Sequence, residues 1–244
     1  MGGQTLMHSG SPLDSFKYNP PKEPFLDILF HDEHIMVVNK PSGLLSVPGR
    51  LAENHDSIIS RIQTMHPDAM AVHRLDMDTS GIMVVGLTKE AISNLGKQFN
   101  QKTVTKRYVA LVDGIIPDEG EVNLPLRCDI ENRPLQIVDF EQGKESRTLY
   151  CRLDNSFISN DYNRPHISAV KLIPVTGRSH QLRVHMAQTG HAILGDRFYA
   201  SDEVMNRTDR LCLHAFYLNF SHPISGNKLE FTSKPEFLKT LPEI

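Results

Sequence analysis

The feature that most constrains the fold is a series of short apolar runs, each bounded by polar or turn-forming residues. Several runs alternate apolar and polar side chains, as in 105–114, which is typical of a half-buried β-strand. The runs at 146–154 and 168–175 predict an antiparallel pair that carries a polar hairpin tip at 156–166. The predicted strands span 26–30, 34–40, 82–88, 105–114, 120–126, 146–154, 168–175, 211–220 and 228–233.

Helical spacing of apolar residues appears in only a few places. Asp56-Ser57 can cap a helix over residues 57–66, and Thr88 can cap a helix over residues 89–101, so we expect a helix in both. Helices are also predicted at 178–190, which ends in a glycine, and at 235–241. Because strands and helices do not alternate, we predict an α+β fold with a mixed, mainly antiparallel sheet flanked by helices and loops.

Composition excludes several classes of protein. Of the 244 residues, 39% are hydrophobic, and no run of about 18 apolar residues predicts a membrane span. The net charge of −3 gives no sign of a nucleic-acid partner, so RNA binding would need a local basic surface. Three cysteines lie far apart without CxxC spacing, and the first fifteen residues lack a signal-peptide core, so we expect a cytoplasmic protein without disulfides.

The stretch HRLDMDTSG (73–81) poses the central functional question. Asp76 and Asp78 stand two residues apart, before a turn whose Thr79 and Ser80 can hydrogen-bond the loop backbone. From the residues alone, Asp76 could be a nucleophile, a metal ligand, or a turn residue facing water.

A second polar cluster lies in GRSHQLRVH (177–185). On a helix, Arg178, Gln181 and His185 lie about one turn apart, as do His180 and Arg183. The two histidines do not match the zinc-binding pattern HExxH, and the cluster alone is consistent with a basic surface helix. We therefore predict no metal site.

These motifs resemble the RluA family of RNA pseudouridine synthases. NKPSGLLSVPG, HRLDMDTSG, TKRYVAL, GRSHQLRVH, LGDRFYA and LCLHA occur in the family's order over residues 34 to about 216. The run 19–50 is most similar to the members that act on both transfer RNA and large-subunit ribosomal RNA. Two features depart from the pattern: Ala200 replaces a glycine, and the 156–166 hairpin looks longer than usual.

The resemblance implies a catalytic domain over residues 25–244, with the active-site cleft across its sheet. Residues 1–24 contain several prolines and few apolar residues, so their composition predicts a flexible N-terminal segment. It would be too short for the S4 domain that some relatives carry. The implied catalytic residues are Asp76, Tyr108 and Arg183, and Arg74 would enter the RNA stack when the target nucleotide leaves. The other expected RNA-binding residues are His73, Lys106, Arg178, His180, Gln181 and His185.

The implied reaction needs no cofactor, since uridine is only rearranged into its C5-glycoside. Asp76 could add to C1′ or to C6, or could act by a glycal route, and the sequence does not choose among these. The expected partners are stem-loops of tRNA and large-subunit rRNA, bound by a monomer without a protein partner. Lys102, Lys106, Arg107, Arg178 and Arg183 would supply local positive charge at the site, and the acidic segments 116–121 and 236–243 would lie elsewhere.

Two other classes of protein fit parts of the sequence. The DMDTS segment resembles the DxDx[TV] loop of magnesium-dependent haloacid-dehalogenase-type phosphatases, but His73 and Arg74 interrupt the apolar strand that should precede it. A non-catalytic RNA-binding or assembly module would use the basic cluster without needing Asp76.

Overall fold

The computed structural model describes residues 17–162 and 165–244. A ten-stranded sheet has its main strands in the order β1-β2-β4-β11-β5-β10-β9-β6, with β3 on β4 and β12 on β11. Strands β4 and β11 run parallel, whereas the other neighbours run antiparallel. The α+β prediction is confirmed. The strands are β1 Ile28–His31, β2 Ile35–Lys40, β3 Met70–Ala71, β4 Ser80–Gly86, β5 Thr105–Asp113, β6 Glu119–Asn123, β9 Arg147–Leu153, β10 Ile167–Pro174, β11 Leu213–Ser221 and β12 Lys228–Thr232.

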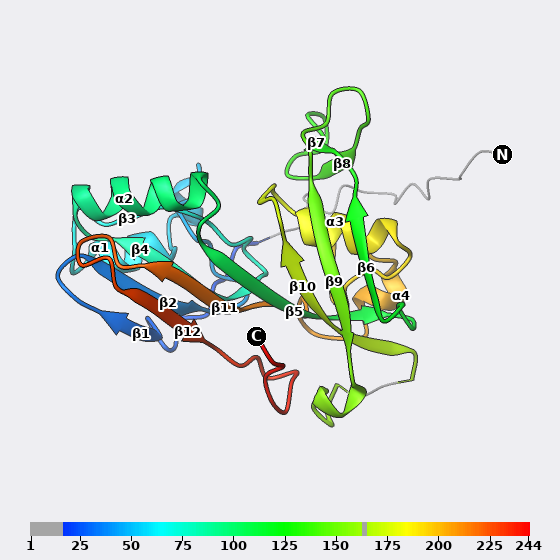
Figure 1. Ribbon diagram of the computed structural model, residues 1–244. Coiled ribbons are helices and arrows are strands. Elements are labelled where there is room, and N and C mark those ends of the chain that lie inside the picture. The colour runs from blue at the N-terminus through cyan, green and yellow to red at the C-terminus, as the bar shows by residue number, and fades with distance from the viewer. Residues whose placement is uncertain (1–16, 163–164) are drawn as a thin grey trace.

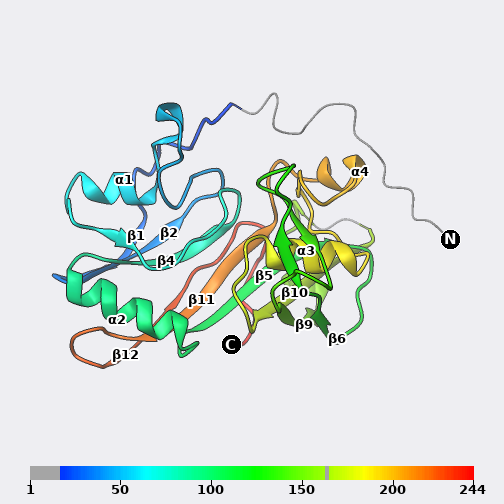
Figure 2. The same ribbon diagram turned by 90° about the horizontal axis from the view of Figure 1, so that it is seen from above.

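The first half of the sheet is covered on both faces by helices (Figures 1 and 2). Strand β2 alternates its side chains between the two faces, so Met36 packs beneath α1 (Ile58–Gln63) and Val37 beneath α2 (Lys89–Asn100). This explains why β2 reads as a continuous apolar run: both of its faces are buried.

The second half of the sheet is built from β5, β10, β9 and β6 and packs against α3 (Gln181–Gln188) (Figure 1). Leu182 and Met186 of α3 join the largest apolar cluster, which includes buried residues of β5 and β10. Strands β5 and β11 pass through the middle of the molecule and connect the halves. A separate two-stranded hairpin, β7 (Leu126–Cys128) with β8 (Gln136–Val138), projects beside α3.

The predicted helices have mixed outcomes. Ser57 and Thr88 cap α1 and α2 as expected, each accepting a backbone N–H through its hydroxyl. The helix predicted at 178–190 begins only at Gln181, because His180 has a left-handed backbone with φ of 51°. The helix predicted at 235–241 is wrong: its backbone pairs with residues 157–159, including an N–H of Lys239 that donates to the carbonyl of Phe157. The four-residue α4 (Asp202–Met205) was not predicted, since one turn leaves no periodic pattern.

Part of the N-terminal segment lies against the domain. The Tyr18 hydroxyl donates to the carbonyl of Asp56 at 2.7 Å and accepts the N–H of Leu45 at 3.0 Å. Arg61, which is 2% exposed, donates to the carbonyl of Pro21. These contacts fix residues 18–21, although composition predicted a flexible segment up to residue 24. Residues 1–16, the rest of that segment, lie outside the described residues.

Within the two described ranges, none of the helices has both the length and the apolar character needed to span a membrane.

Candidate active site

The loop that carries Asp76 connects β3 to β4 and is held by the turn-rich segment 41–49. The Ser46 hydroxyl donates to the carbonyl of Leu75 at 2.6 Å and accepts its N–H at 3.0 Å. The Ser42 hydroxyl donates to the carbonyl of Asp78 at 2.7 Å. The backbone on both sides of Asp76 is therefore fixed by a neighbouring loop.

Lys40 holds the same two loops together from the inside. Its side chain is fully buried, and Nζ lies within hydrogen-bond distance of three carbonyl oxygens, those of Pro41 at 2.9 Å, Leu44 at 2.6 Å and Met77 at 2.8 Å. Burial lowers the pKa of Lys40 to about 7, and the nearby carboxylates of Asp78 and Asp76 oppose that shift. The three acceptors match the three N–H donors of an ammonium group.

The Asp76 carboxylate meets Arg183, which rises from α3. Arg183 Nη1 lies 3.5 Å from Asp76 Oδ2, and the Arg183 side chain is 2% exposed against 26% for Asp76. Arg183 Nε and Nη2 donate to the two oxygens of buried Asp196 at 2.8 and 2.7 Å. Asp196 thus fixes the guanidinium in a two-point ion pair and leaves Nη1 directed at Asp76.

His180 faces Asp76 from the start of α3. Its Nε2 lies 4.0 Å from Asp76 Oδ2, and its Nδ1 lies 2.6 Å from the hydroxyl of Tyr199. That hydroxyl also accepts the backbone N–H of Gln136 at 2.9 Å. The His180 ring stacks on Phe198, with 5.7 Å between ring centroids, and burial lowers the pKa of His180. The left-handed backbone of His180 costs about 1–3 kcal/mol for a residue other than glycine.

Tyr108 reaches the site from β5, where it lies opposite Ala215 of β11. Burial is the main cause that raises the pKa of Tyr108, and the charge of Asp76 raises it further. Tyr108 is therefore a neutral phenol near neutral pH. Asp76, Tyr108 and Arg183, which the sequence predicted as catalytic residues, come from three separate elements and gather where the two halves of the sheet meet.

The junction of β4 with β11 supports the Asp76 loop from behind. Gly81 has φ of +117°, and a Cβ there would lie 2.3 Å from the carbonyl oxygen of Ala215. Beside it, Ser80 Oγ lies 2.7 Å from Nδ1 of buried His214 and accepts a hydrogen bond from Arg210 at 2.5 Å. The Thr-Ser-Gly turn and the LCLHA segment of the sequence are thus the two sides of one tight joint.

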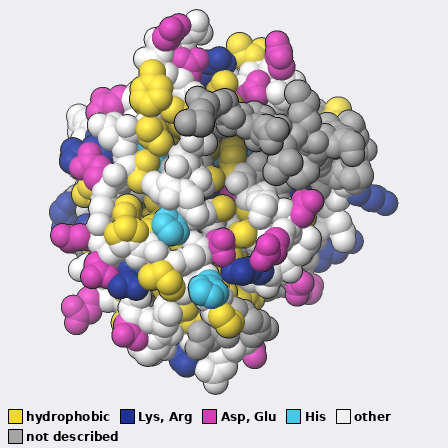
Figure 3. Space-filling model, turned by 90° about the vertical axis from the view of Figure 1, so that its right-hand side faces the viewer, with side chains coloured by type: hydrophobic (Ala, Val, Ile, Leu, Met, Phe, Trp, Pro, Cys, Tyr) yellow, Lys and Arg dark blue, Asp and Glu magenta, His cyan; other side chains and the backbone are white. Residues whose placement is uncertain are grey.

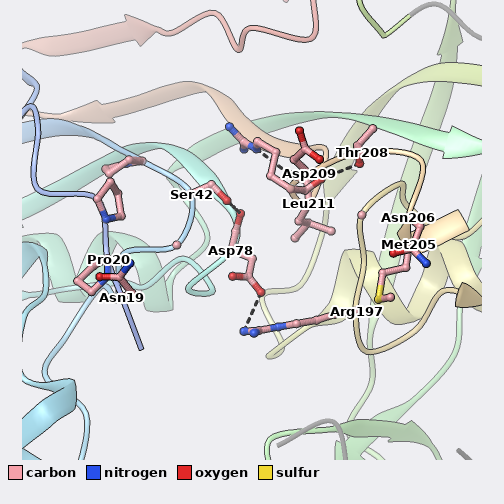
Figure 4. Close-up of a pocket in the computed structure, with 15 residues that line it drawn as sticks. Asn19, Pro20, Ser42, Asp78, Arg197, Met205, Asn206, Thr208, Asp209 and Leu211 are labelled. Atoms are coloured by element: carbon pink, nitrogen blue, oxygen red, sulfur yellow. Dashed lines mark hydrogen bonds and ion pairs between the residues drawn. The ribbon is translucent and has the colours of Figure 1, made fainter. Parts of the chain in front are cut away.

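Asp78 lies beside the site and pairs with Arg197, whose Nη2 is 3.0 Å from Asp78 Oδ2. Figure 4 shows this pair among the residues that line a pocket. The pocket has a volume of about 860 Å³ and is also lined by Ser42, Thr208 and Leu211. The sequence assigned no role to Asp78. The structure places Asp78 in the wall of this pocket, next to the candidate site, where Arg197 holds its carboxylate.

Of the predicted RNA-binding residues, Arg74 and Arg178 are exposed. His73 instead stacks on Phe99, with ring centroids 4.4 Å apart, and its Nε2 accepts the N–H of Val84. Burial lowers the pKa of His73 to about 3, so the ring is neutral. Lys106 is partly buried over Phe99, with Nζ 6.0 Å from the ring centroid, and burial lowers its pKa.

Gln181 and His185 require a correction, because both side chains are buried rather than available to RNA. The Gln181 amide accepts from Thr176 and Arg178 and donates to Arg147 and Thr148. His185 bonds the Thr148 hydroxyl through Nδ1 and the Leu124 carbonyl through Nε2. The polar face of α3 is thus mostly an internal network that anchors the helix to β9.

Charges around the site are paired rather than uniformly basic. Arg183 and Arg197 each face a carboxylate, and Glu236, expected far from the site, pairs at 2.6 Å with Arg210 beside the β4–β11 joint. Figure 3 shows basic and acidic side chains interspersed on the face that holds β6 and α4. In the described parts of the chain, no three His, Cys, Asp or Glu side chains are grouped to hold a metal ion.

Sequence reasoning missed four residues of the site: Lys40, Asp196, Arg197 and Tyr199. Three of them belong to LGDRFYA, which the sequence analysis recognised as a motif but did not connect with Asp76. The available signal was that this motif holds an Asp, an Arg and a Tyr and closely follows the predicted helix 178–190, which carries Arg183.

Comparisons with known proteins agree with the geometry. The family model described as RNA pseudouridylate synthase matches residues 34–188. The dual-specificity RNA pseudouridine synthase RluA of Escherichia coli strain K12 is 53% identical over 221 residues, covering 90% of this chain and 98% of the relative. The RluA of Vibrio parahaemolyticus is 54% identical, covering 86% of this chain and 83% of the relative. Among solved structures, human RNA pseudouridylate synthase domain containing 1 has a TM-score of 0.71 at 30% identity and covers 95% of this chain and 88% of its own.

Proposed function

The chain belongs to the RNA pseudouridylate synthase family, and we propose that Asp76 is the centre of its isomerase reaction. It is an RNA pseudouridine synthase, an isomerase that acts on RNA. Its relatives are called dual-specificity enzymes. We propose that this chain likewise acts on two RNAs, at uridines in a tRNA anticodon stem-loop and in large-subunit rRNA.

The observation that carries the proposal is the setting of Asp76. It is a partly exposed carboxylate on a braced loop, and its Oδ2 faces the guanidinium of buried Arg183 at 3.5 Å. A positive charge at that distance attracts the carboxylate and orients it. This geometry is consistent with a catalytic role for Asp76. It is consistent with all three possible routes, which are attack at C1′, attack at C6 and a glycal route.

The reaction conserves all atoms of the nucleoside. The N1–C1′ bond breaks, the uracil turns and a C5–C1′ bond forms. C5 then loses its proton, and N1 gains one. Removal of the C5 proton by Tyr108 would require a phenolate, and the raised pKa of Tyr108 disfavours that form. We therefore propose that the Tyr108 ring stacks on the uracil and that its hydroxyl acts as a hydrogen-bond donor.

The target nucleotide must leave its stem-loop to reach Asp76. Exposed Arg74, two residues before Asp76, is the side chain that we propose fills the vacated place in the RNA stack. The remaining exposed arginine of the predicted set, Arg178, is proposed to contact phosphate. We further propose that the enzyme works as a monomer in the cytoplasm and without a cofactor.

The test is release of tritium from C5-labelled uridine in transcribed tRNA and rRNA, with EDTA present. The wild type should release tritium from both RNAs, Asp76→Asn should release none, and the matched variant Asp78→Asn should keep activity. Activity on one RNA alone would remove the dual specificity. Equal release by wild type and Asp76→Asn would overturn the role of Asp76.

A further inference from the structure

His180 is held in a strained backbone conformation that aims its ring at Asp76. The part of the chain that the structure describes has three non-glycine residues with positive φ, and His180 is one of them. At this position before α3, its side chain caps no backbone N–H. A left-handed residue that gains no capping bond points to another function for its side chain.

The His180 ring has a defined partner at each nitrogen. Nδ1 lies 2.6 Å from the Tyr199 hydroxyl, and Nε2 lies 4.0 Å from Asp76 Oδ2. Because the Tyr199 oxygen already accepts the N–H of Gln136 at 2.9 Å, its own hydrogen is free to be donated to Nδ1. With Tyr199 as the donor, the ring proton would be on Nε2, the nitrogen that faces the carboxylate.

The two groups that face Asp76 act on the same oxygen. Arg183 Nη1 and His180 Nε2 both approach Oδ2, at 3.5 and 4.0 Å. Neither distance is a closed hydrogen bond, and such contacts shorten when substrate fills a site. Two donors on Oδ2 would leave Oδ1 available to the nucleoside.

We propose that His180 is a positioning residue for Asp76, kept in its Nε2–H form by Tyr199 and by the Gln136 N–H of the β7–β8 hairpin. This relay runs from the hairpin through Tyr199 and His180 to Oδ2, and it selects Oδ1 as the reacting oxygen. The inference rests on the proposed role of Asp76 and deepens it.

The first test is a double-mutant cycle of Tyr199→Phe and His180→Gly, followed by single-turnover rate at saturating enzyme and by the Kd for RNA. Glycine keeps the positive φ without strain, and phenylalanine keeps the ring against which Arg183 packs. Each single variant should lower the rate by about ten-fold, as loss of one hydrogen bond does, with the Kd changed less than two-fold. In the His180→Gly background, Tyr199→Phe should have no further effect, because it acts through His180.

Tyr150→Phe on β9 is the matched control, and its rate should equal that of the wild type. The relay would be overturned if the rate losses of Tyr199→Phe and His180→Gly multiplied in the double variant. An unchanged rate in His180→Gly would also overturn it. A raised Kd with an unchanged saturating rate would also overturn it, since His180 would then only contact RNA. Activity of Asp76→Asn in the same assay would instead overturn the proposed function.

The second test reads the tautomer directly, by nitrogen-15 NMR of histidine-labelled protein without RNA. In the wild type the His180 signals should show an unprotonated Nδ1 and a protonated Nε2, and Tyr199→Phe should mix the two forms. An Nδ1-protonated ring in the wild type would overturn the proposal whatever the kinetics of the variants.

Discussion

Arg183, which faces Asp76, forms a buried ion pair with Asp196 through two hydrogen bonds of 2.8 and 2.7 Å, and the two side chains are 2% and 1% exposed. Asp196 also accepts the N–H groups of Phe198 and Tyr199, so its carboxylate is fully used. The pair therefore sets where the remaining Nη1 of Arg183 points, and so where Asp76 is held.

Replacement of Asp196 by alanine should destabilise the fold strongly. The change leaves the Arg183 charge buried without its partner, which typically costs about 3–5 kcal/mol in the free energy of unfolding. Urea denaturation measures this cost. The control is Glu121→Ala, which removes the exposed partner of Arg147 and should cost less than about 1 kcal/mol. Similar losses for the two variants would contradict the structural role given to Asp196.

Gly81→Ala should be tolerated poorly for a reason that lies in the backbone. The new Cβ would meet the carbonyl of Ala215 at 2.3 Å, in a conformation with φ of +117° that side chains rarely adopt. We expect a lower melting temperature and a loss of tritium release, because β4 and β11 must separate beside the Asp76 loop. Gly96→Ala, within α2 and with no atom within 4 Å of the new Cβ, should instead stabilise the protein by up to about 1 kcal/mol. A neutral Gly81→Ala would show that the joint is not tight.

Local patterns predicted the strands and the motif loops, because alternation, caps and turn residues are determined by near neighbours in sequence. They did not predict the pairing of Arg183 with Asp196, which are 13 residues apart and joined across a loop. They also assigned Gln181 and His185 to a surface, since α3 shows no clean apolar stripe. Both are buried by hydrogen bonds to β9 and to the segment before β7, which only the tertiary fold supplies.

Lys40 should make the stability of the protein depend on pH above neutrality. Its pKa in the fold is about 7, below its ordinary value of 10.5, so between these values the unfolded chain holds a proton that the folded chain has released. Burial of the charged Lys40 therefore destabilises the folded protein fully below pH 7. This destabilisation decreases as the pH rises toward 10.5. The free energy of unfolding should rise with a slope of up to about 1.4 kcal/mol per pH unit in that window.

Lys40→Met tests this dependence by denaturation at pH 7 and pH 9. The variant should lose the contribution of Lys40 to the slope and should also lower the rate of tritium release, because Met77 loses a donor next to Asp76. Lys97→Met on the exposed face of α2 should leave both slope and rate unchanged. An unchanged slope in Lys40→Met would show that Lys40 stays protonated across the window.

Arg74 should affect RNA without affecting the fold, since its side chain is exposed beside the Asp76 loop. Arg74→Ala should keep the free energy of unfolding within about 0.5 kcal/mol of the wild type. It should also weaken RNA binding, reduce the salt dependence of the Kd by about one counterion, and lower the single-turnover rate about ten-fold.

Arg74→Lys separates the charge of Arg74 from its planar shape. This variant should restore the salt dependence of the Kd. Its single-turnover rate should remain about ten-fold below that of the wild type, because a lysine side chain cannot stack in the place of a base. Arg152→Ala, which removes an exposed partner of Asp118 on the far strand pair, is the control. Full recovery of the rate in Arg74→Lys would mean that Arg74 contributes charge alone and that another group fills the gap left by the flipped uridine.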